Sequence, residues 1–158
     1  MKEAKEGLKE AARNRQAFFL YEILERFEAG IALLGPEVKS VRAGRIQLKD
    51  AYASVEGGEA WLHQCHIAPY AQHTHLSLTP LDPLRRRKLL LHKKEILKMR
   101  GWVDQKGLTL VPLRVYFKGG KVKVELGLGR GKKAYDKRDA IREKDLDREQ
   151  ARALRERG

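Results

Sequence analysis

The stretch 108–128, LTLVPLRVYFKGGKVKVELGL, carries the clearest structural signal in the chain. Two apolar runs flank the tetrapeptide KGGK, which is a turn sequence. In the second run Val122, Val124 and Leu126 alternate with charged residues, which gives a strand one buried and one solvated face. Proline cannot donate to a sheet ladder, so Pro112 in the first run predicts a bulge or a sheet edge. The stretch is therefore predicted to form an antiparallel hairpin.

Upstream of this hairpin, shorter patterns predict more strands and a helix. The segments 50–55 (DAYASV) and 59–67 (EAWLHQCHI) flank two consecutive glycines, which predicts a second hairpin. The segment 36–44, PEVKSVRAG, predicts a short helix, because it places proline at the first helical position and glycine at the exit.

Three other segments carry weaker patterns. The segment 17–35 is rich in aromatic and β-branched residues and predicts one or two strands broken near residues 29–30, but its apolar residues also fit a helical period. The segment 71–87 contains two prolines and predicts a long surface loop. Leucines and isoleucine at helical intervals predict a helix over about 93–100, opened by the basic run RRRK at 85–88.

Together these elements predict a mainly β fold. About six short antiparallel strands with two short helices, all before residue 130, favour a small closed or nearly closed barrel. We divide the chain into a charged N-terminal extension at 1–13, the barrel at 14–129 and a basic C-terminal tail at 130–158.

The charge of the chain indicates its partner. Lys and Arg number 34 against 21 Asp and Glu, which gives a net charge of +13 and a pI of about 10.0. Such a surface is typical of nucleic-acid binding. The sequence shows no membrane-spanning run and no signal peptide, and its single cysteine, Cys65, fits a reducing compartment. We therefore expect a cytoplasmic monomer that does not bind membranes.

Motifs for catalysis are incomplete. GLGRGKK resembles a phosphate-binding loop, but Leu126 stands where glycine is needed and Lys133 where a hydroxyl is needed. A cluster of histidines lies near Cys65, without the spacing of a structural zinc site. The histidines are His63, His66, His73 and His75. We predict no enzyme, metal or cofactor, and keep a metal- or thiol-dependent enzyme built on this cluster as an alternative.

Six motifs, in order, resemble the SsrA-binding protein family, also called small protein B. They are NRQA (14–17), FEAGIALLGPEVKSVRAGRIQLKDAY (27–52), GEAWLHQCHIAPY (58–70), RRRKLLLHKKEI (85–96), KGLTLVPLRVYF (106–117) and KVKVELGLGRGKKAYDKRDAIREKD (121–145). The resemblance implies an oligonucleotide-binding-type (OB-fold) antiparallel barrel without enzymatic activity. It further implies an adaptor that binds the tRNA-like domain of transfer-messenger RNA and accompanies it to ribosomes stalled on messages lacking a stop codon. A general single-strand-binding barrel with a basic tail is the alternative.

The resemblance also places RNA contacts in these motifs. Asn14 would offer a donor and an acceptor to a base edge, and Glu28 would accept hydrogen bonds from base amino or imino groups. Leu90 would contact an unstacked base, with core packing as its alternative role. The predicted contacts are Asn14, Arg15, Glu28, Leu90 and His92, with Lys39, Arg42 and Lys88 on phosphates.

One departure from the family pattern lies between the first two motifs. Family members often carry a basic and a polar residue where this chain has Phe18 and Phe19. These aromatic side chains could stack on bases or fill the barrel.

The tail is poor in residues that could form a core. Ile141, Leu146 and Leu154 are too sparse for a buried stripe, so we expect disorder in the free protein. Charged residues and alanines at helical spacings predict a helix once ribosomal RNA supplies contacts. The resemblance places the tail in the decoding centre of the small ribosomal subunit and the empty mRNA channel, with lysines on phosphates and a tyrosine stacked on a base. The predicted ribosome contacts are Gly131, Lys132, Lys133, Tyr135, Asp136, Lys137 and Arg138.

Overall fold

The computed structural model describes residues 8–69, 81–132 and 148. The predictions for the tail beyond Lys132 and for His73 and His75 lie outside these residues.

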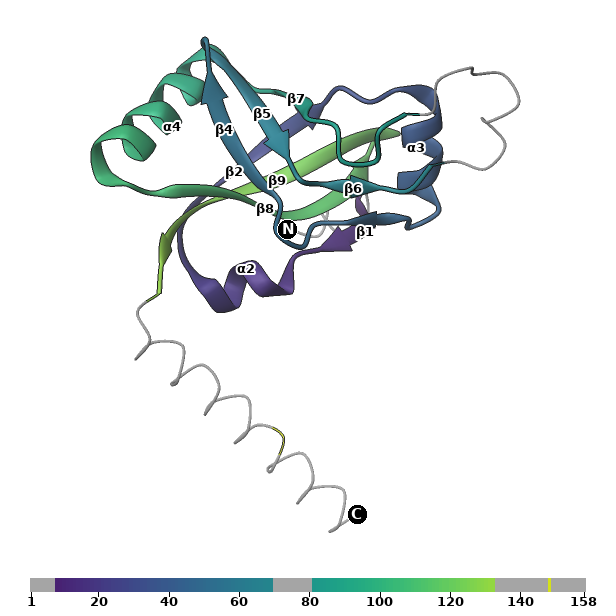
Figure 1. Ribbon diagram of the computed structural model, residues 1–158, viewed down its shortest axis with the longest axis horizontal. Helices are drawn as coiled ribbons and strands as arrows, with labels where there is room; N and C mark the ends of the chain where they lie inside the picture. Colours follow the sequence, from purple (N-terminus) through teal and green to yellow (C-terminus); the bar gives the residue numbers. More distant parts are fainter. Residues whose placement is uncertain (1–7, 70–80, 133–147, 149–158) are drawn as a thin grey trace.

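Six antiparallel strands close into a ring, which confirms the predicted mainly β barrel with short helices (Figure 1). In order around the ring they are β8 (Thr109–Lys118), β4 (Tyr52–Glu56), β5 (Glu59–His63), β7 (Arg87–Leu90), β2 (Tyr21–Ile31) and β9 (Lys121–Gly131). The pairing of β9 with β8 closes the ring. A separate two-stranded sheet pairs β3 (Ile46–Gln47) with β6 (His66–Ile67).

The hairpin of β8 and β9 is the predicted one, and Pro112 marks a bulge in it. The register between the two strands shifts between Pro112 and Arg114. On the other edge of β8, Leu110 pairs with β4, whereas the part from Arg114 onward pairs with β1 (Leu8–Arg13). Residues assigned to the N-terminal extension thus contribute a strand to the sheet, and β9 continues beyond residue 129.

The segment 17–35 combines both readings of its pattern. Its first residues complete the helix α2 (Arg15–Leu20), and β2 starts directly afterwards. The predicted break near residues 29–30 is wrong, because β2 continues to Ile31 through pairing with β7. The predicted helix at 36–44 is confirmed as α3 (Gly35–Arg42).

The third helix extends beyond the predicted end at residue 100, and it does not begin at the basic run RRRK (85–88). RRRK does not open a helix, since β7 begins at Arg87 and pairs with β5 and β2. The helix α4 (Lys93–Lys106) passes through Gly101 and ends at Gly107, whose φ of 63° is the left-handed conformation that glycine adopts without strain.

Apolar side chains from all sides of the ring fill the barrel, among them Leu62, Leu89, Leu110 and Leu126. Ile96 and Met99 of α4 join this core. In Figure 1, α4 and α3 lie at opposite ends of the barrel, and α2 lies where β9 leaves it. None of the helices in the described part is long and apolar enough to cross a bilayer.

A buried ionic cluster joins α3 to the start of β7. Glu37, whose side chain is 4% exposed, accepts hydrogen bonds from Arg85 and, at 2.6 Å, from Nε of Arg87. Arg87 also donates to the backbone carbonyls of Cys65 (2.7 Å) and Pro83 (3.1 Å). Burial raises the pKa of Glu37, but the donors around its carboxylate outweigh this effect, and the pKa is lowered overall.

Candidate RNA interface

Four predicted RNA contacts lie around one cavity, although they come from different motifs. The cavity, called here the Glu28 cavity, has a volume of about 560 Å³ and lies between β2, β7 and the start of α4. Glu28, Lys88, Leu90 and His92 all line it, and Lys123 of β9 joins them. The structure thus brings together half of the predicted set and adds a second lysine.

The pairing of β2 with β7 positions Leu90 at the mouth of this cavity. Gly30 lies opposite Leu90 in the ladder, and a Cβ added to Gly30 would lie 3.2 Å from Cβ of Leu90. A side chain at position 30 would therefore crowd Leu90. Leu90 is 53% exposed, so core packing, the alternative role for this side chain, is excluded.

Glu28 is held from the other side by two residues of β8. The hydroxyl of Tyr116 donates to Oε2 of Glu28 at 2.6 Å, and Nζ of Lys118 lies 3.3 Å from Oε1. The hydrogen bond from Tyr116 is the main cause that lowers the pKa of Glu28, and Lys118 and Lys123 lower it further. A carboxylate has about four lone-pair sites, so these two donors fix Glu28 in the ionised form and leave acceptor capacity for a ligand.

The support for Glu28 extends across the outer face of the sheet. Arg114 donates to Glu125 at 3.0 Å and its guanidinium lies 4.9 Å from the ring centre of Tyr116. Arg26 also donates to Glu125, at 3.1 Å. Burial and the bond to Glu28 both raise the pKa of Tyr116, which therefore stays protonated and can donate at neutral pH.

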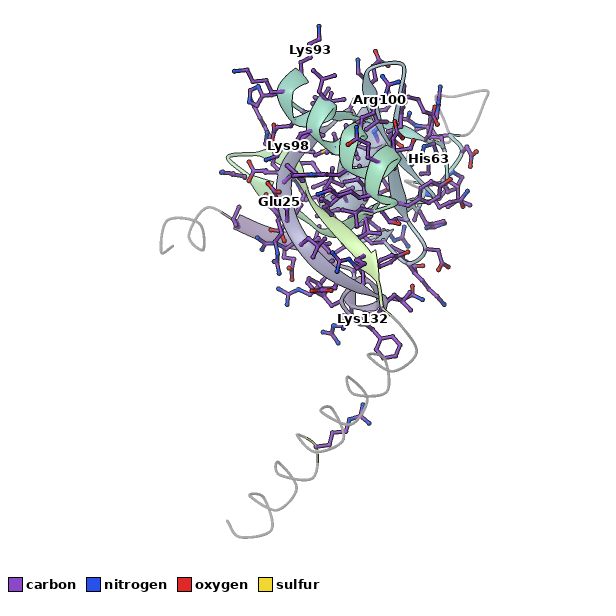
Figure 2. The ribbon with its side chains drawn as sticks, turned by 90° about the vertical axis from the view of Figure 1, so that its left-hand side faces the viewer. Glu25, His63, Lys93, Lys98, Arg100 and Lys132 are labelled. Atoms are coloured by element: carbon purple, nitrogen blue, oxygen red, sulfur yellow. The ribbon has the colours of Figure 1, made fainter. Side chains whose placement is uncertain are left out.

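Two lysines, Lys88 and Lys123, contribute positive charge to the lining of the cavity. Lys88 is paired with Glu59 at 3.2 Å. Within the described residues Lys123 forms no ion pair, and the same is true of Lys93, Lys94 and Lys121, which do not line the cavity. Figure 2 shows α4 with Lys98 next to Glu25 of β2, to which it donates at 3.4 Å. The ammonium groups of Lys93, Lys94, Lys121 and Lys123, which form no ion pair within the described residues, are suited to phosphate contacts.

His92 lies at the start of α4. Its backbone N–H donates to Glu95 at 3.3 Å, which fixes the first turn of the helix, and its side chain is exposed beside the cavity.

Asn14 has a different environment from the one expected. It is 6% exposed, and its amide nitrogen donates to the carbonyls of Pro112 (2.9 Å) and Leu48 (3.3 Å). Its side-chain oxygen caps α2 by accepting from the backbone of Ala17 at 3.2 Å. In this conformation Asn14 fixes α2 to the barrel, and the exposed Arg15 follows it on the helix.

The remaining predicted phosphate contacts lie on α3. Lys39 and Arg42 are exposed there, and the guanidinium of Arg42 lies 5.4 Å from the ring centre of Phe117. Neither lines the Glu28 cavity.

The base of the tail is attached to α2. The backbone N–H of Lys132 donates to the carbonyl of Leu20 at 2.9 Å, and its ammonium to the carbonyl of Phe18 at 3.1 Å. Figure 2 shows Lys132 at the end of the barrel where the chain leaves it. Phe18 lies outside the core, with the guanidinium of Arg26 5.6 Å from its ring centre. Of the predicted ribosome contacts, Gly131 and Lys132 are described, and the others lie outside the described residues.

Cys65 is buried, and the neighbouring His63 is held by contacts within the protein. Burial raises the pKa of the Cys65 thiol to about 11, so the thiol is protonated at neutral pH. The ring of His63 stacks on Tyr52 at 4.9 Å and shares a hydrogen bond of 2.7 Å with Ser54. In the part of the chain that the structure describes, no three His, Cys, Asp or Glu side chains are grouped to hold a metal.

Sequence reasoning missed the residues that support Glu28. Tyr116 and Lys118 alternate on one face of β8, which is a visible period-two signal. Their contact with Glu28, however, depends on β9 lying between β2 and β8, and a local sequence pattern does not indicate which strands are neighbours.

Known proteins resemble this chain over most of its length. A family model described as SmpB protein matches residues 11–156. The SsrA-binding protein of Sulfurihydrogenibium sp. (strain YO3AOP1) is 58% identical over 144 residues, which cover 89% of this chain and 91% of the relative. That of Synechococcus elongatus (strain ATCC 33912 / PCC 7942 / FACHB-805) is 56% identical, over 94% of this chain and 96% of the relative.

A solved structure is also similar. A chain described as "tmRNA-SmpB: a journey to the center of the bacterial ribosome" shares 52% sequence identity with a TM-score of 0.65, and the match covers 83% of this chain and 94% of that chain. The family match and these relatives extend over nearly the whole length. The chain therefore belongs to the SmpB family of SsrA-binding proteins.

Proposed function

We propose that this protein binds transfer-messenger RNA and acts in trans-translation as a non-enzymatic adaptor. The observation that carries the proposal is the Glu28 cavity, where an oriented carboxylate, an exposed leucine and lysines from separate strands meet. Membership of a family whose members are named SsrA-binding proteins identifies the RNA.

The chemistry of the cavity suits an unpaired region of folded RNA. An ionised carboxylate repels phosphate and accepts hydrogen bonds from base amino and imino groups, which are accessible in loops and bulges. Leu90 offers apolar contact to such a base, and Lys88 and Lys123 neutralise phosphates on either side. We place the tRNA-like domain of transfer-messenger RNA here.

Asn14 acts in this scheme as a positioning residue. Its three hydrogen bonds fix α2, so that Arg15 is presented on the surface of the barrel. Lys39 and Arg42 supply further positive charge on α3, away from the cavity.

The second part of the proposal is delivery to stalled ribosomes. The tail at 130–158 would engage the decoding centre and the mRNA channel, supported by its basic residues and by the similarity to a chain described in the bacterial ribosome. Because ribosomes translate in the cytoplasm, we place the protein there.

A competition experiment tests RNA recognition. Labelled transfer-messenger RNA is bound at moderate salt and challenged with either unlabelled transfer-messenger RNA or an unrelated structured RNA. We expect only the first to compete at comparable concentration. Equal competition would indicate a general nucleic-acid-binding barrel, since charge-driven binding does not distinguish sequences.

Glu28→Ala measures the contribution of the carboxylate. The substitution removes a base contact and should weaken specific binding by about 1–3 kcal/mol. Glu25→Ala is the matched control, because Glu25 lies on the same strand but pairs with Lys98 outside the cavity. Affinity that is equally reduced in both variants would mean that the strand was disturbed and that Glu28 reads no base.

Truncation separates the two parts of the proposed function. The cut belongs after Lys132, since Gly131 still pairs with Tyr21 and Lys132 is bonded to α2. The truncated protein should bind transfer-messenger RNA with nearly unchanged affinity and fail to support tagging on stalled ribosomes. A large loss of RNA affinity would show that the tail is part of the RNA site.

A further inference from the structure

Leu90 stands between two hollows. The first is the Glu28 cavity. The second, called here the Val38 hollow, has a volume of about 360 Å³ and is lined by Val38, Ile31, Leu33 and Val122, among others. The two share the residues Gly30, Leu90 and Lys123, so they meet at the exposed leucine. Volumes of this size are typical of small-ligand sites, at about 300–1,000 Å³.

Strand pairing fixes the position of the Leu90 backbone. Its backbone is held in the ladder between β7 and β2, where Leu90 lies opposite Gly30. Because it is 53% exposed and has hollows on two sides, its side chain offers two apolar flanks.

The two hollows differ in chemistry. The Glu28 cavity presents carboxylates and a histidine, which can accept or donate hydrogen bonds. The lining of the Val38 hollow consists of apolar side chains, glycines, Lys121 and Lys123. A base in the first can be read by its edge, whereas a base in the second is held by apolar contact that every base can make.

Lys123 is the charged residue that the two hollows have in common. It lines both hollows, and within the described residues neither it nor Lys121 forms an ion pair. Its ammonium is therefore available to a bridging phosphate.

We propose that Leu90 is a wedge between two consecutive unpaired nucleotides, whose bases are splayed into the Glu28 cavity and the Val38 hollow. Lys123 binds the phosphate that joins them. Apolar side chains inserted between base steps unstack nucleic acids in this way. This inference rests on the proposed function and goes beyond it, because it specifies a dinucleotide step in which one base is selected and its neighbour is not.

The test uses 2-aminopurine, whose fluorescence rises on unstacking, placed in turn at each purine or tolerant position of the single-stranded loops of transfer-messenger RNA. Wild-type protein should raise the fluorescence at two consecutive positions. Leu90→Ala should abolish this paired increase and weaken binding about tenfold, through lost apolar burial. Leu90→Met, which keeps an apolar side chain of similar volume, should preserve the pair and show that the site folds.

Leu97→Ala is the matched control. Leu97 is 57% exposed on α4 and lines neither hollow, so this variant should behave as wild type. An increase at a single position, at none, or an undiminished pair in Leu90→Ala would overturn the wedge while specific, Glu28-dependent binding still supported the proposed function. Binding that is insensitive to Glu28→Ala and to RNA identity would instead overturn both.

Discussion

Two glutamates of this protein both accept hydrogen bonds from other residues, but one is buried and the other is exposed. Glu37 accepts hydrogen bonds from Arg85, Arg87 and the backbone N–H of Leu34, and its side chain is 4% exposed. Glu28 accepts from one phenol and one ammonium, and its side chain is 41% exposed. In both cases the donors lower the carboxyl pKa.

The difference lies in the remaining acceptor capacity. The oxygens of Glu37 are enclosed by donors that the protein itself supplies, so this carboxylate fixes α3 against β7 and has no access to a ligand. The oxygens of Glu28 are oriented by β8 but open to a cavity. A carboxylate is therefore suited to binding a ligand when the protein orients it by hydrogen bonds but leaves some of its acceptor sites free.

Glu37→Gln should have the largest effect. It leaves two arginines, one of them 1% exposed, without a counter-charge, and breaking a buried pair costs about 3–5 kcal/mol of unfolding free energy. Urea denaturation measures this value. Glu56→Gln, which breaks the exposed pair with Arg86, is the control and should cost about 0–1 kcal/mol. Equal losses in the two variants would contradict the contrast drawn here.

The wild type and Glu37→Gln should also differ in how their stability depends on pH. The pKa of Glu37 is lower in the folded chain than its ordinary value of 4.5, so its contribution to stability is present above that value and is lost as the pH falls through the folded pKa. Acid should therefore destabilise the wild type more steeply than Glu37→Gln. Parallel stability curves would show that Glu37 is not the group that titrates.

Tyr116→Phe should have a smaller effect, on binding. Without the hydroxyl, Glu28 loses its main orienting donor, and affinity for transfer-messenger RNA should fall by about 0.5–1.5 kcal/mol. The pKa of Glu28 should also rise toward its ordinary value, so that the loss of binding in acid begins at a higher pH.

A double-mutant cycle distinguishes positioning from a structural role. In a Glu28→Gln background, Tyr116→Phe should have almost no further effect on affinity, because the residue it positions is already gone. Additive losses would mean that Tyr116 acts on RNA binding by another route.

Regular local patterns predicted the fold well. Alternation over Val122, Val124 and Leu126 located the hairpin that closes the barrel, and Pro112 located its bulge. The pattern failed at RRRK, because a run of charge carries no period, and there the buried bonds of Arg87 to Glu37 decide the conformation.

Sequence motifs predicted part of the candidate site, and the strand arrangement added residues such as Tyr116. Glu28 and Leu90 were identified through resemblance, and in the structure both line one cavity. Tyr116 and the roles of Asn14 and Glu37 were not predictable, since each depends on partners distant in sequence that no local rule pairs.

The strand pairing has a consequence for how the protein is made. The earliest strands, β1 and β2, hydrogen-bond to β8 and β9, which are synthesised about a hundred residues later. Contacts of such separation form late, and an emerging chain keeps its apolar faces uncovered until they do. A copy of this protein interrupted before residue 109 would lack both closing strands and could not complete its own barrel. This protein is proposed to act where synthesis of other polypeptides stops early. Its own chain, if stopped before residue 109, could not reach the native state.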